Sequence, residues 1–314
     1  AVDFTNRGSK RASPLRSNGG SSVTSVRTPN FLVIGAAKSG TTALCDDLRA
    51  HPDICFSLPK ETFFFNREDC WNRGMDWYER CFAHHSGEAA IGDGSTEYSL
   101  RGVFPEAAGR IHRTLGTPRV VYVVREPLSR IESMWMELRS QGLEQQAFID
   151  AVQRSLWYVD GSRYAHQIAA FDAFLPREHI LLLTHDAYVE APAETLARIC
   201  RFLDVDPSFA FPRAGEFRYA STGKREDTGL GNLVRRRLPG FRSVQARSPE
   251  WLTALAKRTL KRPIDGRPVW TTATRRSVWD AVEGDVRSIL ERAHESDRFD
   301  AWRKRAFDRP VVDP

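Results

Sequence analysis

Apolar runs of strand length alternate with segments of helical periodicity through most of the chain. Phe31–Ile34 is a continuous apolar run, and the same pattern predicts further strands at 90–91, 120–124 and 180–184. Apolar residues at helical spacing predict helices near 127–139, 145–156, 164–174 and 192–203. This alternation predicts an α/β fold with a largely parallel sheet covered by helices on both faces.

The two ends of this region differ from it in pattern. Residues 1–29 are rich in Ser, Gly, Arg and Asn and have almost no apolar periodicity, so we predict a disordered N-terminal tail. Residues 30–314 are expected to form a single domain. After Pro212 the pattern becomes irregular and basic, until an amphipathic helix is predicted around Val278, Val282 and Val286.

Composition is that of an ordinary globular protein, with 41% hydrophobic and 27% charged residues in 314. The apolar runs are too short to span a membrane, and no charged-then-apolar leader opens the sequence, so a cytoplasmic location is expected. Five cysteines, an odd number without C-x-x-C spacing, suggest reduced thiols rather than a disulfide framework or a zinc site, and no metal site is expected.

Positive charge is distributed unevenly. The net charge is +6, but residues 1–30 carry +4 and residues 233–276 carry +10, with twelve Lys or Arg against two acidic residues. Such a segment is suited to nucleic acid, an anionic membrane, an anionic acceptor or a polyanionic cofactor, or forms a solvated face. Charge alone does not decide among these.

Chemistry first enters in the loop after the first predicted strand. Gly35–Thr42 has Walker A spacing, with Gly at the first and sixth positions and Thr at the eighth, but the seventh position, normally Lys, is Thr41. The lysine stands three residues earlier, as Lys38. Backbone N–H groups at a helix start, hydroxyls and one ammonium still form an anion cradle, without the triphosphate and metal signature.

A second motif follows the strand R-V-V-Y-V-V. This strand ends in Arg125, where a nucleotide triphosphatase often has a magnesium-linked Asp. Pro127 favours a helix start directly afterwards, which places Ser133 about two turns into that helix. Arg125 and Ser133 are therefore candidates for holding a second phosphate.

The stretches FLVIGAAKSGTTAL and RVVYVVREPLSRIESMW resemble the 5'-phosphosulfate loop and the 3'-phosphate motif of the sulfotransferases that use 3'-phosphoadenosine 5'-phosphosulfate (PAPS). The likeness is greatest to the branch with the heparan sulfate sulfotransferases and bacterial relatives, and covers roughly 31–302. It implies a P-loop-NTPase-like central parallel sheet flanked by helices. It also implies that Arg125 and Ser133 bind the 3'-phosphate. The residues implied for the 5'-phosphosulfate are Lys38, Ser39, Gly40, Thr41 and Thr42.

The resemblance extends to catalysis through L-P-K-E-T-F-F-F, residues 58–65, which is similar to the K-E-x-x-F-F element of this branch. It implies that Glu61 is the base that takes the acceptor proton, and the adjoining Phe run is expected to desolvate this carboxylate. Lys38 would also stabilise the transferring group. A closing loop over the cofactor is matched by Thr222, Gly223 and Lys224.

Other residues in the region of resemblance are assigned less directly. The branch commonly has a lysine at the position of Gly94, which puts a heparan-like acceptor in doubt. Ser95 and Tyr98 are candidates for facing the acceptor. Trp77 and Tyr78 are expected to be core anchors rather than ligands. His84 and His85 are alternatives for acid–base chemistry, although a surface pair without a catalytic role is the simpler reading.

We therefore predict a PAPS-dependent sulfotransferase acting on a hydroxyl of a carbohydrate or small-molecule acceptor, with the acceptor and oligomeric state left open. One alternative, an NTP-dependent phosphotransferase, would require a lysine at position 41 and an acidic magnesium ligand where Arg125 stands. Another is a non-catalytic module that binds nucleic acid or another polyanion through residues 233–276. That segment contains few aromatic residues for stacking on bases, so nucleic acid is not expected as a partner.

Overall fold

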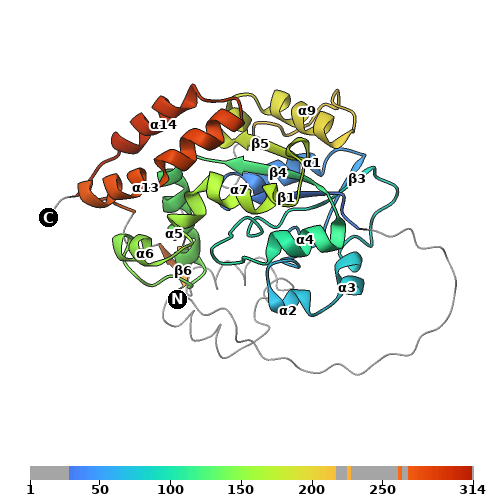
Figure 1. Cartoon of the computed structure of the whole chain (residues 1–314), viewed down its shortest axis with the longest axis horizontal. Coiled ribbons are helices and arrows are strands. Elements are labelled where there is room, and N and C mark those ends of the chain that lie inside the picture. Colours follow the sequence, from blue (N-terminus) through green and yellow to red (C-terminus); the bar gives the residue numbers. More distant parts are fainter. Residues whose placement is uncertain (1–27, 217–224, 228–260, 264–267, 313–314) are drawn as a thin grey trace.

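A computed structural model describes residues 28–216, 225–227, 261–263 and 268–312 (Figure 1). Five parallel strands form the central sheet in the order β2-β3-β1-β4-β5. Their bounds are β1 Phe31–Gly35, β2 Ile54–Phe56, β3 Ala90–Asp93, β4 Arg119–Val124 and β5 Ile180–Thr184. The predicted α/β architecture with a parallel sheet is confirmed. The predicted tail, except for residues 28 and 29, lies outside the described residues.

Helices cover both faces of the sheet (Figure 1). On β1, Phe31 and Val33 pack into one hydrophobic cluster, whereas Leu32 and Ile34 pack into the other. This alternation is the two-residue period of a strand that is buried on both sides. The first cluster is completed by α1 Thr41–Leu48, α8 His185–Glu190 and α9 Pro192–Leu203. The larger second cluster contains residues of α4 Ala107–Leu115, α5 Pro127–Ser140, α6 Phe148–Arg154, α7 Tyr164–Asp172, α13 Thr272–Arg292 and α14 Arg298–Phe307.

Smaller elements complete the described chain. The short helices α2 Glu68–Trp71 and α3 Met75–Arg80 lie between β2 and β3 in sequence, and 3-10 turns span Asp160–Ser162 and Arg177–His179. The strands β6 Arg225–Asp227 and β7 Lys261–Pro263 form a separate antiparallel pair. Of the basic segment 233–276, residues 233–260 and 264–267 lie outside the described residues.

Differences from the sequence-based elements are confined to short segments. β2 was not predicted, because its three residues are too few to show a period. α4 was also not predicted, and the helix expected at 145–156 is shorter, α6 Phe148–Arg154. By contrast, β5 and α9 have the predicted bounds, Ile180–Thr184 and Pro192–Leu203.

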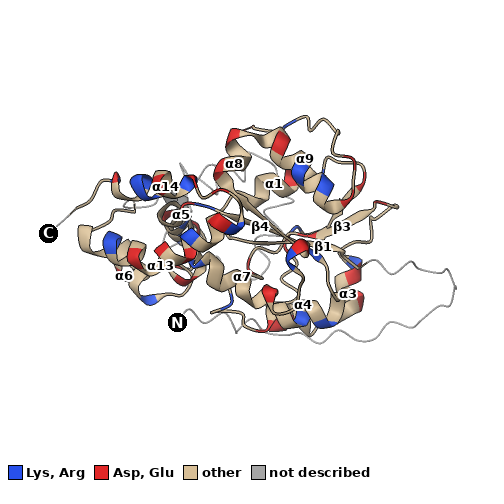
Figure 2. Cartoon of the chain, turned by 45° about the horizontal axis from the view of Figure 1, so that its top comes forward, with Lys and Arg blue, Asp and Glu red and all other residues tan. Residues whose placement is uncertain are grey.

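Charged residues of both signs are interspersed over the helices in view, whereas the central strands carry few (Figure 2). In the described part of the chain, no helix is both long enough and apolar enough to cross a membrane.

Candidate active site

The phosphate-type loop joins the end of β1 to the start of α1. Gly40 precedes the helix in the left-handed conformation, and no side chain caps the first turn of α1, which also carries no acidic residue. The N–H groups of such a turn lack intrahelical partners and attract an anion, together with the positive end of the helix dipole. Thr41 and Thr42 open the helix and line the adjoining cavity with Lys38 and Gly40.

Gly40 is required by conformation and by space. Its φ is +83°, and a Cβ there would lie 2.7 Å from Cδ2 of His185. Lys38 also has a positive φ, of 74°, which is unfavourable for a residue with a Cβ and is found mainly where a function requires the conformation. The loop backbone is therefore shaped for a close approach that a regular turn would not provide.

A fully buried arginine supports this loop from below. Arg130 in α5 donates to the carbonyl of Ala37 at 3.4 Å and to Trp157 O at 2.8 Å, and its Nε donates to Ser162 Oγ at 2.7 Å. Buried donors of this kind need a partner on each N–H, and here several partners are backbone carbonyls. The contact joins the loop to the helix that carries the second motif.

Arg125 stands directly after β4 and contacts the loop. Its Nη1 donates to Lys38 O at 3.2 Å, and its own carbonyl accepts from Tyr164 OH at 2.6 Å. Burial lowers the pKa of Arg125 from its ordinary value, but the guanidinium stays charged at neutral pH. A poorly hydrated cation at this position is suited to pairing with a phosphate. Ser133, in α5, is buried at the wall of the same cavity.

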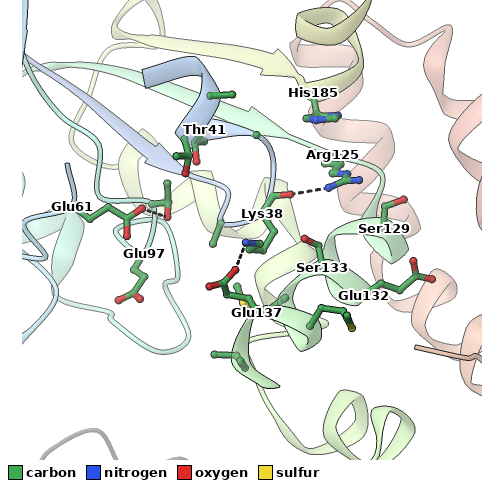
Figure 3. A pocket seen from close by; sticks show the side chains of 18 of the residues that line it. Lys38, Thr41, Glu61, Glu97, Arg125, Ser129, Glu132, Ser133, Glu137 and His185 are labelled. Atoms are coloured by element: carbon green, nitrogen blue, oxygen red, sulfur yellow. Dashed lines mark hydrogen bonds and ion pairs between the residues drawn. The ribbon is translucent and has the colours of Figure 1, made fainter. Parts of the chain in front are cut away.

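In the close-up view, Glu61 and Arg125 lie on opposite sides of Lys38 (Figure 3). Its Oε1 accepts from Lys60 Nζ at 2.9 Å and from Thr96 Oγ1 at 3.2 Å, and 30% of its side chain is exposed. The expected enclosure of Glu61 by the Phe run is wrong: Phe64 and Phe65 are buried in the core, because they pack on one another and on Tyr78.

One cavity of about 1040 Å³ brings these groups together. Lys38, Gly40, Thr41, Thr42, Glu61, Arg125 and Ser133 all contribute to its lining. In Figure 3, Lys38 lies between Glu61 on one side and Arg125 and Ser133 on the other. The volume is at the upper end of the usual range for small-molecule sites.

Two groups of predicted site residues are not among those seen at this cavity, one because of its position and one because the structure does not describe it. Ser39 is fully buried beneath the loop, its N–H bonded to Ala36 O at 3.1 Å, and it is not among the described residues that line the cavity. Thr222, Gly223 and Lys224 lie outside the described residues.

The candidates for acid–base and acceptor roles in the 77–98 region are placed clearly. Ser95 and Tyr98 were candidates for facing the acceptor, but both are buried, and their hydroxyls donate to the buried Asp93 carboxylate, which needs such donors. Tyr78 is fully buried and Trp77 packs at the edge of the core, so both are core residues. His84 contacts Cys55 and His85 contacts Glu88, and neither is among the described cavity-lining residues.

The position of Gly94 has a structural explanation. Any side chain there would meet Cys45 Sγ and Lys60 Cε, both at 3.2 Å from a Cβ. Lys60 Nζ donates to Gly94 O at 3.1 Å and to Glu61. Lys60 thus occupies the space beside Glu61 that a lysine at position 94 would enter.

Among the cavity residues that the sequence analysis did not single out, Glu137 and His185 contact the predicted site residues. Glu137, on α5, forms an ion pair with Lys38, with 2.7 Å between Oε2 and Nζ (Figure 3). Its spacing of four from Ser133 places it on the same helix face, a signal that was available. His185, the first residue of α8, lies beside Arg125 and Gly40, and burial together with the Arg125 charge lowers its pKa to about 4. His185 comes close to Arg125 because β5, which precedes it, pairs with β4, which precedes Arg125.

Comparisons with known proteins show the family of this chain. The model of the sulfotransferase family matches residues 29–209, so the chain belongs to the sulfotransferase family, in a branch with heparan sulfate enzymes and bacterial relatives.

Individual relatives extend the comparison. The chain is 30% identical over 186 residues to mouse heparan sulfate glucosamine 3-O-sulfotransferase 6, covering 56% of this chain and 52% of that protein. It is 27% identical over 212 residues to mouse bifunctional heparan sulfate N-deacetylase/N-sulfotransferase 3, covering 61% and 24%. At best, the chain spans about half the length of these two relatives.

A solved structure supports the fold. A sulfotransferase from Alicyclobacillus acidocaldarius superposes with a TM-score of 0.61 at 20% identity, covering 88% of this chain and 99% of that one. The P-loop-like sheet flanked by helices is therefore the fold of this protein.

Proposed function

We propose that this protein transfers a sulfuryl group from PAPS to a hydroxyl of a carbohydrate or small-molecule acceptor. The observation that carries the proposal is the contact of Arg125 with the loop: Arg125 Nη1 donates to the backbone carbonyl of Lys38 at 3.2 Å, and both residues line the same cavity. A donor with a 5'-phosphosulfate and a 3'-phosphate presents anions at two places, which suits a helix N-terminus with Lys38 and a separate arginine.

The described residues fit such a donor. The uncapped first turn of α1 offers its N–H groups to phosphate oxygens, with Thr41 and Thr42 as hydroxyl donors. Arg125 and Ser133 share the cavity wall and would hold the 3'-phosphate. PAPS, when bound, supplies an activated sulfuryl group whose leaving group is a phosphate.

Glu61 is the proposed general base. The acceptor hydroxyl gives its proton to the Glu61 carboxylate while its oxygen forms a bond to sulfur and the bond from sulfur to the phosphate oxygen breaks. Lys38 offsets the negative charge that develops on the leaving oxygen, and to do so it exchanges Glu137 for the donor. Lys60 and Thr96, which bond Glu61 Oε1, orient the carboxylate and leave Oε2 for the proton.

Calorimetric titration tests the donor. The product 3'-phosphoadenosine 5'-phosphate (PAP) should bind tightly, whereas ADP with Mg²⁺ should bind weakly or not at all. Preference for ADP with Mg²⁺ would favour a phosphotransferase, and binding of neither would favour the non-catalytic module.

Glu61→Gln tests the base. It should leave PAP affinity unchanged and lower turnover of PAPS with a hydroxyl acceptor by about 10²- to 10⁴-fold, the usual contribution of a general base. Wild-type turnover in this variant would assign proton removal to another group. Screening acceptors for PAP release, with the variant as the blank, identifies the acceptor class.

A further inference from the structure

A buried carboxylate lies behind Glu61 and is not used in the scheme above. Asp93, the last residue of β3, is fully buried. Its Oδ1 accepts from Ser95 N at 3.0 Å and Ser95 Oγ at 2.6 Å. Its Oδ2 accepts from Thr62 Oγ1 at 2.7 Å, Tyr98 OH at 2.7 Å and Tyr78 OH at 3.0 Å. Every donor recorded for it in the described part of the chain is neutral.

Two of these hydroxyls also hold the backbone that follows Glu61. Ser95 Oγ accepts from the N–H groups of Thr62 at 2.9 Å and Phe63 at 3.1 Å, and Thr62 Oγ1 accepts from Phe64 N at 3.2 Å. A hydroxyl has one proton and two lone pairs. Because Ser95 and Thr62 give their protons to Asp93, their lone pairs are directed at three successive N–H groups.

The backbone before Glu61 is bound to the same turn. Lys60 O accepts from Gly94 N at 3.2 Å and from Ser57 Oγ at 2.9 Å. Thr96, three residues after Asp93, donates to the Glu61 carboxylate itself. Phe63 has a φ of 54°, a conformation that a residue with a Cβ keeps only when its surroundings fix it. Residues 60–64 are thus held on both sides of Glu61 by residues 93–96.

We propose that Asp93 is the positioning residue for Glu61: by accepting from Ser95 and Thr62, it fixes the hydroxyls that hold residues 62–64 and so aims the Glu61 carboxylate at the acceptor. This inference depends on the proposed role of Glu61. Asp93 is not itself the base, since it has no exposed surface and both of its oxygens accept hydrogen bonds.

The alternative is that Asp93 has a purely structural role and does not position Glu61. Tyr78 stacks on Phe64 with ring centroids 4.4 Å apart, so the network also joins core side chains. Loss of any of its members is expected to cost stability. Positioning predicts something more: a loss of turnover that requires Glu61 and spares donor binding.

Asp93→Asn is the direct variant, but the loss of a fully buried carboxylate can prevent folding. The test therefore changes Thr62, and Asp93 stays in place. Thr62→Val keeps the shape but removes the hydroxyl, whereas Thr62→Ser keeps the hydroxyl. Tyr78→Phe is the matched control, because it removes one donor to Asp93 without touching the backbone of 62–64. The measurements are kcat at saturating acceptor, PAP affinity by calorimetry and thermal stability.

The expected result is a kcat about 10- to 100-fold lower in Thr62→Val, the size expected for a misplaced catalytic group. Thr62→Ser and Tyr78→Phe should stay within about twofold of wild type, and all variants should bind PAP normally. In a Glu61→Gln background, Thr62→Val should change kcat by less than about twofold, because coupled residues are not additive.

Wild-type kcat in Thr62→Val, or equal losses in the wild-type and Glu61→Gln backgrounds, would overturn the positioning role while leaving the proposed function intact. Normal kcat in Glu61→Gln alone would instead remove the base assignment, and the positioning role with it. PAP titration decides the donor independently of either result.

Discussion

The ion pair between Lys38 and Glu137 predicts that the Glu137 carboxylate competes with the donor's phosphate groups for Lys38. Lys38 Nζ lies 2.7 Å from Glu137 Oε2, and 24% and 27% of the two side chains are exposed. An anion that reaches the loop must replace this carboxylate and overcome its negative charge. Glu137→Gln removes the charge and keeps an oxygen acceptor, so it should tighten PAP binding.

The magnitude follows from the burial of the pair. Two unit charges about 4 Å apart interact by about 4 kcal/mol at an effective dielectric constant of about 20, whereas fully exposed pairs contribute about 0.2–1 kcal/mol. For a mostly covered pair that the ligand partly replaces, we expect about 1–2 kcal/mol. This corresponds to a PAP dissociation constant about 5- to 30-fold lower in Glu137→Gln.

Calorimetry of PAP binding at low and at high salt is the assay, and the gain should shrink at high salt because screening weakens the competing pair. Glu283→Gln is the control, since Glu283 has a similar 2.9 Å pair with Arg287 but is not among the described cavity residues. In a Lys38→Ala background the gain should be smaller. Unchanged or weaker PAP binding in Glu137→Gln would refute the competition.

Three further predictions test the loop and its surroundings. Arg125→Ala should weaken PAP binding by about 10- to 150-fold, the loss of a charge-assisted hydrogen bond, while AMP, which lacks the 3'-phosphate, binds as to wild type; an equal loss for AMP would contradict the 3'-phosphate assignment. Gly40→Ala should lower the free energy of unfolding, measured by denaturant titration, by more than Gly74→Ala does. Both glycines have a positive φ, but only a Cβ at position 40 would clash with His185. Equal losses would show that the contact with His185 is relieved. The pKa of His185 is about 4 in the folded state against about 6.5 in the unfolded state, so its contribution to stability is complete above about pH 6.5 and falls by about 3 kcal/mol towards pH 4. His185→Gln should lack this fall. Parallel profiles of stability against pH in the variant and the wild type would show that the histidine does not titrate this way.

The sequence alone was sufficient for the fold class, and it singled out the loop after β1 and Arg125 as candidates for binding the donor. The strand 31–34 and the loop to Thr42 are contiguous, so local pattern and glycine positions define them without distant contacts. Arg125 follows the neighbouring strand β4, and the carboxyl ends of parallel strands meet at one edge of the sheet. Once β1 and β4 are neighbours, which the structure shows, that rule brings Lys38 and Arg125 together.

The surroundings of Glu61 depended on tertiary structure. The pattern K-E-x-x-F-F suggested an apolar enclosure, but Phe64 and Phe65 turn into the core and Glu61 is bonded by Lys60 and Thr96. Ser95 and Tyr98 likewise showed no sign in sequence of being bound to a buried carboxylate. Which way a side chain in an irregular segment points is decided by partners far away in the chain.

What the sequence determined by itself is therefore the α/β class, most of its longer strands and helices, and the position of the loop with Walker A spacing, because periodicity and glycine placement act over a few residues. Only the tertiary structure decided that Lys38 pairs with Glu137, 99 positions later, and that Asp93 holds residues 62–64 from the end of β3. Such pairings are set by packing of the whole domain, since a buried polar group bonds to whichever donor or acceptor the fold brings within reach.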